Sequence, residues 1–293
     1  MNDAIQVRNL QKSYGSKKVL RDLTFDVDCG EIFALLGING AGKTTTLECI
    51  EGLRQYDGGT IAVNGRCGVQ LQSSSLPGTM KAAEALTLFS KWQKTKVDDT
   101  YLERLGVQPF IHKQYAQLST GQKRRLHLAL ALLGDPDIII LDEPTAGLDV
   151  EGRVAIHREI LKLKEQGKTI ILASHDMAEV EELCDRIGIL KKGILAFLGT
   201  PSKLTEAEKT LFLLKVRFTS PVEFAENSVL EGGCGDDGYC TFRTENLEDT
   251  LAFIIENVKA QGSTMSDIHV ERAGIEERFL EIAKEERNES DVI

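Results

Sequence analysis

Two short apolar runs, at 138–141 and 169–173, show no alternation between apolar and polar positions. Strands that are covered on both faces have this composition, which is typical of a parallel sheet. The segment 151–166 between the two runs reads as a helix, which supplies the crossover that neighbouring parallel strands require. The pattern therefore predicts an α/β core.

Other segments alternate or repeat at helical spacing. Residues 4–10 and 19–27 alternate, which predicts two strands of an antiparallel face. The apolar run 31–36 has the length of a strand, and a helix can begin at 45. Four further predictions are a hairpin at 60–65 with Asn64-Gly65 at its turn, a helix at 80–92, a helix that begins near 118 and stops at Asp135-Pro136, and a hairpin formed by 187–190 and 194–197.

The pattern changes after residues 199–202, so we expect a domain at 1–204 and a second, small α+β domain at 205–293. The second domain is predicted to hold strands at 211–218, 239–243 and 268–270, a turn at 232–238, an amphipathic helix at 247–258 and a last helix at 275–282. The polar tail 285–293 is expected to fray.

Composition limits the function. The chain has 293 residues and a formal net charge of −10, which argues against a nucleic-acid backbone as its main partner. It has no secretory signal and no apolar run near the roughly 18–20 residues of a membrane span, so we expect any membrane role to come through a partner. Six scattered cysteines form no C-x-x-C pair. Cys234 and Cys240 are close enough to pair, but reduced thiols are expected in a cytosolic chain.

Residues 37–44 carry the motif on which the functional prediction depends. They match G-x-x-x-x-G-K-[ST], a loop whose backbone N–H groups cradle phosphate. A predicted strand precedes the motif and a predicted helix follows it, which is the context that it needs. The helix N-terminus adds partial positive charge, Lys43 would reach the β- and γ-phosphates, and the Thr44 hydroxyl would ligate Mg²⁺.

Candidate catalytic groups follow two of the predicted strands. Asp142 and Glu143 come directly after the apolar run 138–141, and His175 follows the run 169–173. Open α/β sheets place their ligands at this edge. Asp142 is a candidate magnesium carboxylate, Glu143 could polarise an attacking water, and His175 could contact the γ-phosphate.

Four further candidate residues have two interpretations each. Gln72 could ligate Mg²⁺ or water, although a single glutamine is a weak signal. Ser119 and Gly121 either cap a helix or present a hydroxyl and N–H groups to an anion. Tyr14 is either a half-buried turn residue or a platform for a nucleotide base.

In this order, the motifs resemble those of ATP-binding subunits of ATP-binding cassette (ABC) transporters, over residues 3–204. The resemblance implies a P-loop NTPase core with antiparallel and helical subdomains. It rests on residues 37–45, Gln72, Leu118-Ser119-Thr120-Gly121-Gln122, residues 141–149 with the run Asp142-Glu143-Pro144-Thr145, and Ser174-His175.

The resemblance also assigns roles. Glu143 would be the general base and His175 the switch histidine, while Tyr14 would stack on adenine. Ser119 and Gly121 would bind the γ-phosphate of ATP held by the other subunit, and Asp149 would lie in the loop that crosses the dimer interface. The full set of ATP-binding candidates is Tyr14, Asn39, Gly40, Ala41, Gly42, Lys43, Thr44, Thr45, Ser119, Gly121 and Asp149, and the candidate Mg²⁺ ligands are Thr44, Gln72 and Asp142.

Two positions depart from the family pattern or compete within it. Thr120 stands where the family usually has glycine, but it leaves Gly121 intact. Gln70 competes with Gln72 for the position that couples ATP to the membrane partner, and the spacing to Gly68 and Leu76 favours Gln72.

The resemblance implies an ATPase that pairs as a homodimer or heterodimer and drives a separate integral membrane permease, with export as the expected direction. Such a subunit is cytoplasmic and peripheral on the inner face of the cell membrane. No nucleic acid is expected as a partner. The alternatives are a soluble ABC ATPase that acts on nucleic acid or ribosomes, and a P-loop kinase or binding module of another kind. The second domain resembles the C-terminal extension of bacterial exporter ATPases, and its role stays open.

Overall fold

The computed structural model describes residues 3–70, 76–174, 176–206, 212–222, 224, 230–234, 238–272 and 275–284. The chain divides into two compact units. The first comprises Met1–Pro201 and Ile282–Ile293, and the second comprises Ser202–Glu281. The sequence placed this boundary after residue 204 and assigned the C-terminal residues to the second domain. The tail 285–293 lies outside the described residues.

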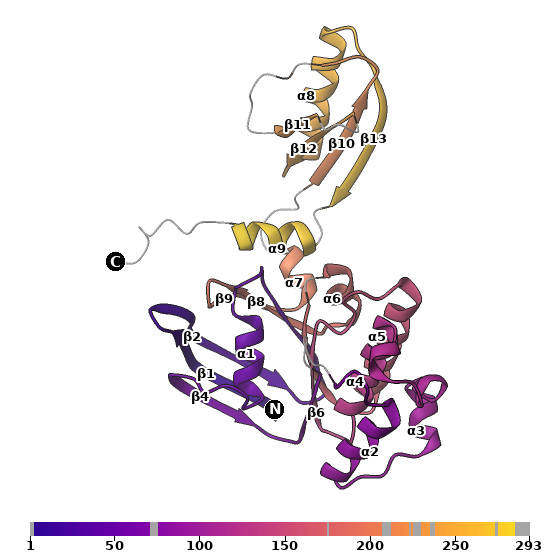
Figure 1. Cartoon of the computed structure of the whole chain (residues 1–293). Coiled ribbons are helices and arrows are strands. Elements are labelled where there is room, and N and C mark those ends of the chain that lie inside the picture. The colour runs from indigo at the N-terminus through magenta and orange to yellow at the C-terminus, as the bar shows by residue number, and fades with distance from the viewer. Residues whose placement is uncertain are drawn as a thin grey trace. The chain divides into compact units, whose positions relative to one another are not determined.

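A six-stranded sheet forms the centre of the first unit (Figure 1). Its order is β5 (Cys67–Gln70), β6 (Ile138–Asp142), β7 (Thr169–Ala173), β3 (Ile32–Leu36), β8 (Arg186–Lys191) and β9 (Ile194–Gly199). The strands from β5 to β8 run parallel, and β9 returns antiparallel to β8. Every residue of β3, β6 and β7 is buried, which confirms the prediction of strands covered on both faces.

Three helices follow strands of this sheet along the chain. Helix α1 (Lys43–Ile50) follows β3, and α6 (Met177–Leu183) follows β7. Helix α5 (Val150–Glu165) joins β6 to β7, which confirms the predicted crossover. Its N-cap is Asp149, whose carboxylate accepts a hydrogen bond from the Gly152 N–H at 2.8 Å.

A three-stranded antiparallel sheet packs beside this core, in the order β2 (Lys17–Asp28), β1 (Asp3–Tyr14) and β4 (Gly58–Val63). The two alternating strands that the sequence predicted are β1 and β2. The predicted hairpin at 60–65 is wrong, because β4 pairs with β1 whereas β5 pairs with β6 in the other sheet. Asn64-Gly65 instead carries the chain between the sheets, where the Asn64 N–H donates to the Ala4 carbonyl at 2.8 Å.

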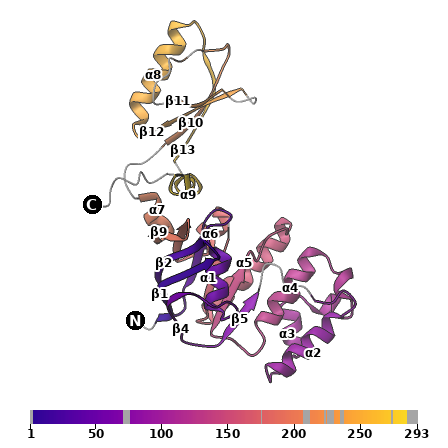
Figure 2. The same ribbon diagram turned by 60° about the vertical axis from the view of Figure 1, so that its left-hand side comes forward.

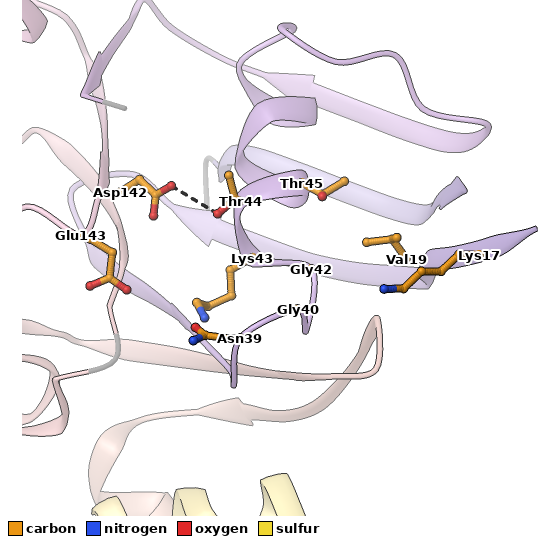
Figure 3. A pocket seen from close by; sticks show the side chains of 10 residues that line it. All are labelled: Lys17, Val19, Asn39, Gly40, Gly42, Lys43, Thr44, Thr45, Asp142 and Glu143. Atoms are coloured by element: carbon orange, nitrogen blue, oxygen red, sulfur yellow. Dashed lines mark hydrogen bonds between the residues drawn. The ribbon is translucent and has the colours of Figure 1, made fainter. Parts of the chain in front are cut away.

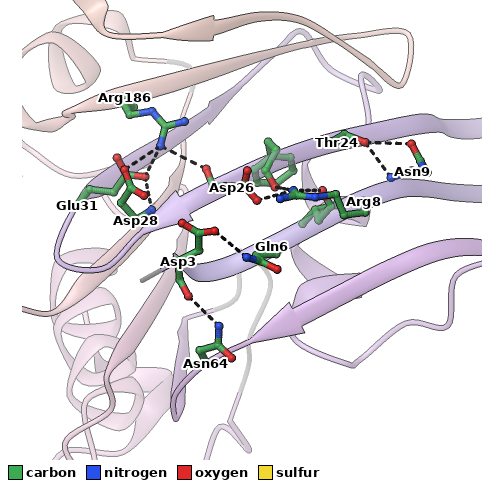
Figure 4. A network of polar contacts seen from close by, with 12 residues as sticks. Asp3, Gln6, Arg8, Asn9, Thr24, Asp26, Asp28, Glu31, Asn64 and Arg186 are labelled. Atoms are coloured by element: carbon green, nitrogen blue, oxygen red, sulfur yellow. Dashed lines mark hydrogen bonds and ion pairs between the residues drawn. The ribbon is translucent and has the colours of Figure 1, made fainter. Parts of the chain in front are cut away.

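Charged side chains bind the two sheets together where β2 passes into β3 (Figure 4). The Arg186 guanidinium at the start of β8 donates to the Glu31 carboxylate at 2.9 Å and lies 3.6 Å from Asp28. Glu31 in turn accepts from the Asp28 N–H at 2.7 Å. This network fixes the base of β3, the strand that leads to the phosphate-binding motif.

A helical segment lies between β5 and β6 (Figure 2). It holds α2 (Ala82–Trp92), α3 (Asp99–Arg104), the short 3-10 helices η1 (Gln108–Phe110) and η2 (Tyr115–Gln117), and α4 (Thr120–Ala131). The predicted capping box opens α4: the Gln122 N–H donates to the Ser119 hydroxyl, and the Ser119 N–H donates to the Gln122 side chain, each at 3.2 Å. Ser119 thereby ends up exposed at the start of a helix.

The second unit is an antiparallel sheet with a helix on one face. The strand order is β11 (Leu230–Cys234), β12 (Tyr239–Thr244), β10 (Phe212–Phe218) and β13 (Met265–Arg272). Its core joins Leu214 and Phe242 of the sheet to Ile254 of α8 (Leu247–Ala260). The short α7 (Pro201–Glu206) precedes this sheet and α9 (Ile275–Lys284) follows it.

Two sequence predictions in this unit are wrong. Residues 232–234, predicted as part of a turn, belong to strand β11, because glycine-rich sequence gave no strand pattern there. Cys240 is disulfide-bonded, whereas the sequence predicted reduced thiols. Cys234 lies opposite Cys240 in the β11–β12 pairing. Cys29, Cys49, Cys67 and Cys184 are free, as predicted.

Within the described part of the chain, no helix is both long and apolar enough to cross a membrane.

Candidate nucleotide-binding site

The glycine-rich loop after β3 is pressed against the antiparallel sheet. Gly42 has φ of +112°, and a Cβ there would lie 2.7 Å from Leu20 Cδ2 and 3.3 Å from the Val19 carbonyl oxygen. Gly40 also has positive φ, at +82°, but a Cβ there would meet nothing within 4 Å. Only glycine fits position 42, since any side chain would push the loop away from β2.

Helix α1 begins with free donors at the end of this loop. Its first internal bond is the one from the Thr46 N–H to the Gly42 carbonyl at 2.9 Å, and Gly42 supplies no side-chain cap. The N–H groups of Lys43, Thr44 and Thr45 precede that bond and remain available, as at any helix N-terminus. The N–H of Ala41 is used within the loop, where it donates to the Ile38 carbonyl at 3.1 Å. The helix end therefore offers several N–H groups and partial positive charge to an anion.

Lys43 folds back over the same loop. Its Nζ donates to the Gly37 carbonyl at 2.5 Å and to the Ile38 carbonyl at 3.5 Å. Burial lowers the pKa of Lys43, while the nearby charges of Glu143 and Asp142 act in the opposite direction. An anion bound in the loop would favour the charged ammonium further.

Thr44 and Asp142 join the loop to strand β6. The Thr44 hydroxyl donates to Asp142 Oδ2 at 3.4 Å. Burial raises the pKa of Asp142, and the neighbouring charge of Glu143 raises it further. A hydroxyl and a buried carboxylate are oxygen donors of the kind that Mg²⁺ prefers, so the residues present fit this ion.

Glu143 has an unusual backbone for a residue with a side chain. Its φ is +52°, and its N–H donates to the Ala173 carbonyl at 2.9 Å. The side chain is mostly buried and lines the same pocket as Lys43 and Asp142. A strained conformation of this kind is a feature of sites where one side chain must be held in a set direction.

These groups surround a pocket of about 230 Å³ (Figure 3). It is lined by Lys17, Val19, Asn39, Gly40, Gly42, Lys43, Thr44, Thr45, Asp142 and Glu143. The sequence did not single out Lys17 and Val19, which come from β2. The paired lysines after the Tyr14 turn were the signal that could have found Lys17.

The other predicted residues either are absent from the described lining of this pocket or lie outside the described residues. Tyr14, 43% exposed, ends β1 opposite Lys17, and its ring centroid lies 5.4 Å from both Lys12 Nζ and Arg54 Cζ. Ala41 is buried in the loop. Gln72 and His175 lie outside the described residues. Gln70, the competitor of Gln72, is buried in β5, and neither polar atom of its side chain has a partner in the described part of the chain.

Residues Leu118-Ser119-Thr120-Gly121-Gln122, the signature stretch, lie next to the loop that ends at Asp149. A Cβ on Gly147 would lie 3.4 Å from the Thr120 methyl, and one on Gly121 would lie 3.6 Å from Leu148 Cδ2. Thr120 therefore packs its methyl against the loop that ends at Asp149. Ser119, Gly121 and Asp149 are absent from the described lining of the pocket.

A phosphate-binding loop, a buried acid after a parallel strand and a capped signature helix define an ABC-type P-loop ATPase. The model of the family described as "ABC transporter" matches residues 20–146. A second model, described as "AAA domain, putative AbiEii toxin, Type IV TA system", matches residues 114–181 within the same unit.

Curated relatives extend the match. The chain is 40% identical over 205 residues to an uncharacterized ABC transporter ATP-binding protein of Methanocaldococcus jannaschii, which covers 68% of this chain and 78% of that protein. It is 34% identical over 280 residues to Nod factor export ATP-binding protein I of Paraburkholderia xenovorans, covering 89% and 84%. It is 36% identical over 218 residues to linearmycin resistance ATP-binding protein LnrL of Bacillus subtilis, covering 68% and 70%. The chain belongs to the ABC transporter ATP-binding family and is an ATPase of that class.

Solved structures agree with the fold. An ATP-binding subunit of an ABC transporter superposes with a TM-score of 0.63 at 28% identity, over 69% of this chain and 92% of that one. A dimeric bacterial ABC transporter cassette superposes with a TM-score of 0.62 at 24% identity, over 67% and 98%. The expected P-loop NTPase fold of the ABC type is confirmed.

Proposed function

We propose that two copies of this chain close around ATP and that their closure drives a separate membrane permease, in the direction of export. The observation that carries the proposal is that the pocket is half of a site. Ten described residues line it, and none of them belongs to the signature stretch. Ser119 instead caps an exposed helix N-terminus, ready to meet a phosphate held elsewhere.

Exposed apolar side chains next to Asp149 support the pairing of two chains. Val150 is 77% exposed and Val154 is 40% exposed, although both lie in the first turns of α5. Apolar side chains of this size are more often covered. A second chain that brings its pocket to Ser119 would also meet this face, because Thr120 packs against the Asp149 loop.

Within each half-site, the residues divide the work of phosphoryl transfer. The N–H groups at the start of α1 and the Lys43 ammonium hold the β- and γ-phosphates of ATP. Mg²⁺, held by Thr44 and Asp142, would neutralise charge on those phosphates. Glu143 accepts the proton of the attacking water, since its side chain lines the pocket beside them.

Three roles come from the family resemblance. Tyr14 stacks on adenine, and in the β1–β2 ladder it pairs with Lys17, which lines the pocket. His175, one residue beyond Ser174 at the end of β7, contacts the γ-phosphate. Gln72, two residues beyond β5, senses the nucleotide and couples it to the permease.

A permease can dock on helix α2. Trp92 is 75% exposed and Leu88 is 55% exposed, and a spacing of four residues places them on one face of the helix. Export is supported by the names of the relatives, which concern Nod factor export and linearmycin resistance. The chain then works on the cytoplasmic side of the membrane, without a nucleic-acid partner.

Glu143→Gln tests the proposed base. The variant removes the proton acceptor and keeps the shape, so we expect ATP hydrolysis to fall by about 10²–10⁴-fold. ATP affinity should survive, and ATP should hold the variant as a dimer that light scattering detects. Glu165→Gln, at an exposed position in the last turn of α5, is the matched control and should behave as wild type. Hydrolysis at the wild-type rate by Glu143→Gln would contradict the assignment.

A further inference from the structure

The last residue of strand β7 holds the backbone of Glu143. The Ala173 carbonyl accepts the Glu143 N–H at 2.9 Å, while Glu143 keeps its positive φ of +52°. A left-handed conformation is unfavourable for a residue with a side chain, because its Cβ crowds the following carbonyl oxygen. It persists only where the surrounding structure holds it, so the position of Ala173 sets the direction of the Glu143 side chain.

Ser174, the next residue along the chain, is firmly anchored. It is 1% exposed, and its hydroxyl donates to Glu179 Oε2 at 2.6 Å. The same hydroxyl accepts the Asp176 N–H at 3.1 Å. The end of β7 is thus tied to a side chain on α6, not merely to its neighbours in the sheet.

Glu179 is a fully buried carboxylate with a partner on each oxygen. Its side chain has 0% exposure, and its second oxygen lies 3.3 Å from Nε2 of His157. The other ring nitrogen of His157 lies 3.0 Å from a carboxylate oxygen of Glu182. A buried carboxylate is costly unless it is paired and hydrogen-bonded, so Glu179 is held in one place by Ser174 and His157 together.

A second link joins the same two helices. Arg153 donates to the Asp176 carboxylate at 2.8 Å. Arg153 and His157 both lie on α5, the helix that begins directly after Asp149. The chain that leaves β7 is therefore fixed to α5 by two contacts, and α5 starts at the loop proposed to cross the dimer interface.

We propose that Glu179 is a positioning residue for Glu143. Glu179 holds Ser174, Ser174 fixes the end of β7, and the Ala173 carbonyl there holds the Glu143 N–H. Glu179 itself touches neither ATP nor water in this role. The proposal rests on the proposed function of Glu143 as the base, and it predicts that breaking the anchor slows hydrolysis without weakening ATP binding.

Ser174→Ala is the sharpest test, because it removes the anchoring hydroxyl and changes no other group. We expect kcat to fall by about tenfold or more, since small misplacements of catalytic groups have effects of this size. The KM for ATP should change by less than about twofold. Glu179→Gln is a second variant with the same expected direction. Glu181→Gln, an exposed residue of the same helix, is the matched control and should keep the wild-type kcat and KM.

A double-mutant comparison separates positioning from general destabilisation. If Ser174 acts through Glu143, Ser174→Ala should not lower the residual single-turnover rate of Glu143→Gln any further. An equal fold-reduction in both backgrounds would overturn the proposal, as would a wild-type kcat for both Ser174→Ala and Glu179→Gln.

The roles of Glu143 as the base and of Glu179 as its positioning residue are tested by different variants. An inactive Glu143→Gln together with a fully active Ser174→Ala removes only the positioning role. Hydrolysis at the wild-type rate by Glu143→Gln removes the proposed base, and the positioning role with it. Thermal melting of each variant confirms that the rates refer to folded protein.

Discussion

The Thr44 hydroxyl lies 3.4 Å from a carboxylate oxygen of Asp142, a residue 98 positions further along the chain. Thr44 lies in the first turn of helix α1 and Asp142 ends strand β6, so this contact joins the phosphate-binding loop to the strand that precedes the candidate base. Both groups are oxygen donors, and they meet at the place where Mg²⁺ would neutralise the phosphates.

Asp142→Asn should separate stability from activity. Burial and the charge of Glu143 raise the pKa of Asp142, so the folded protein pays to keep this carboxylate ionised at neutral pH. The amide removes that cost, and we expect the nucleotide-free variant to have a higher unfolding free energy than wild type. Mg²⁺-dependent hydrolysis should fall by at least about 100-fold, because the metal loses a charged ligand.

Thermal melting without nucleotide and ATPase assays over a range of Mg²⁺ concentrations measure the two effects. EDTA should abolish wild-type hydrolysis and leave the melting temperature unchanged. Normal Mg²⁺-dependent hydrolysis by Asp142→Asn would contradict the assigned role.

Gly42→Ala should disrupt the loop far more than Gly40→Ala does. Both positions have positive φ, but only at Gly42 would a Cβ meet other atoms, 2.7 Å from Leu20. We expect Gly42→Ala to weaken ATP binding by more than about 100-fold, whereas Gly40→Ala carries only the backbone strain of about 1–2 kcal/mol. Titration with a fluorescent ATP analogue compares them, and equal losses of affinity would show that the close packing on β2 does not matter.

Glu51 is expected to make the unfolding free energy of the first unit depend on pH. Burial, with the charges of Asp142 and Glu48, raises the pKa of Glu51 to about 7. Its Oε2 has no hydrogen-bond partner among the described residues. Between pH 4.5 and about 7, the Glu51 carboxyl therefore stays protonated in the folded state, whereas it is ionised in the unfolded chain. The corresponding stability is present below pH 4.5 and is lost as the pH rises through 7.

Glu51→Gln removes this dependence. Relative to wild type, the variant should be more stable at pH 8 than at pH 5, by about 1–2 kcal/mol or several degrees in melting temperature. Glu165→Gln should show no such change between the two pH values. Equal effects of Glu51→Gln at both pH values would contradict a raised pKa.

The sequence predicted the central elements well because their patterns are strong. The runs that became β6 and β7 contain only buried residues, and Ser119 with Gln122 forms the predicted capping box. The candidate catalytic residues Asp142 and Glu143 could be predicted for the same reason, because they directly follow such a run. The strands that pair with β4 and β5 could not be predicted, since Asn64-Gly65 has the local signature of a hairpin turn. The pairing of β5 with β6 is a long-range contact, and it excludes the hairpin.

Long-range packing accounts for what the sequence missed in the site. Lys17 and Val19 line the pocket because the antiparallel sheet lies against the glycine loop, which no local pattern specifies. The anchor from Glu179 to Ser174 depends on the approach of α6 to the end of β7, and the contact with His157 depends on α5. The spacing of residues along the sequence could not show any of these contacts, because each depends on how separate elements pack against one another.

The central claim is that each ATP is held by Lys43 of one chain and Ser119 of another. Lys43→Ala and Ser119→Arg should each abolish hydrolysis alone, the first by removing a phosphate ligand and the second by filling the place where the γ-phosphate docks. A mixed dimer contains one intact composite site, built from the Lys43 of one variant and the Ser119 of the other. Mixing the two inactive proteins should therefore restore about a quarter of the wild-type rate, as expected for random pairing of two chains. No recovery of hydrolysis, with both variants folded and wild type active, would contradict the shared site.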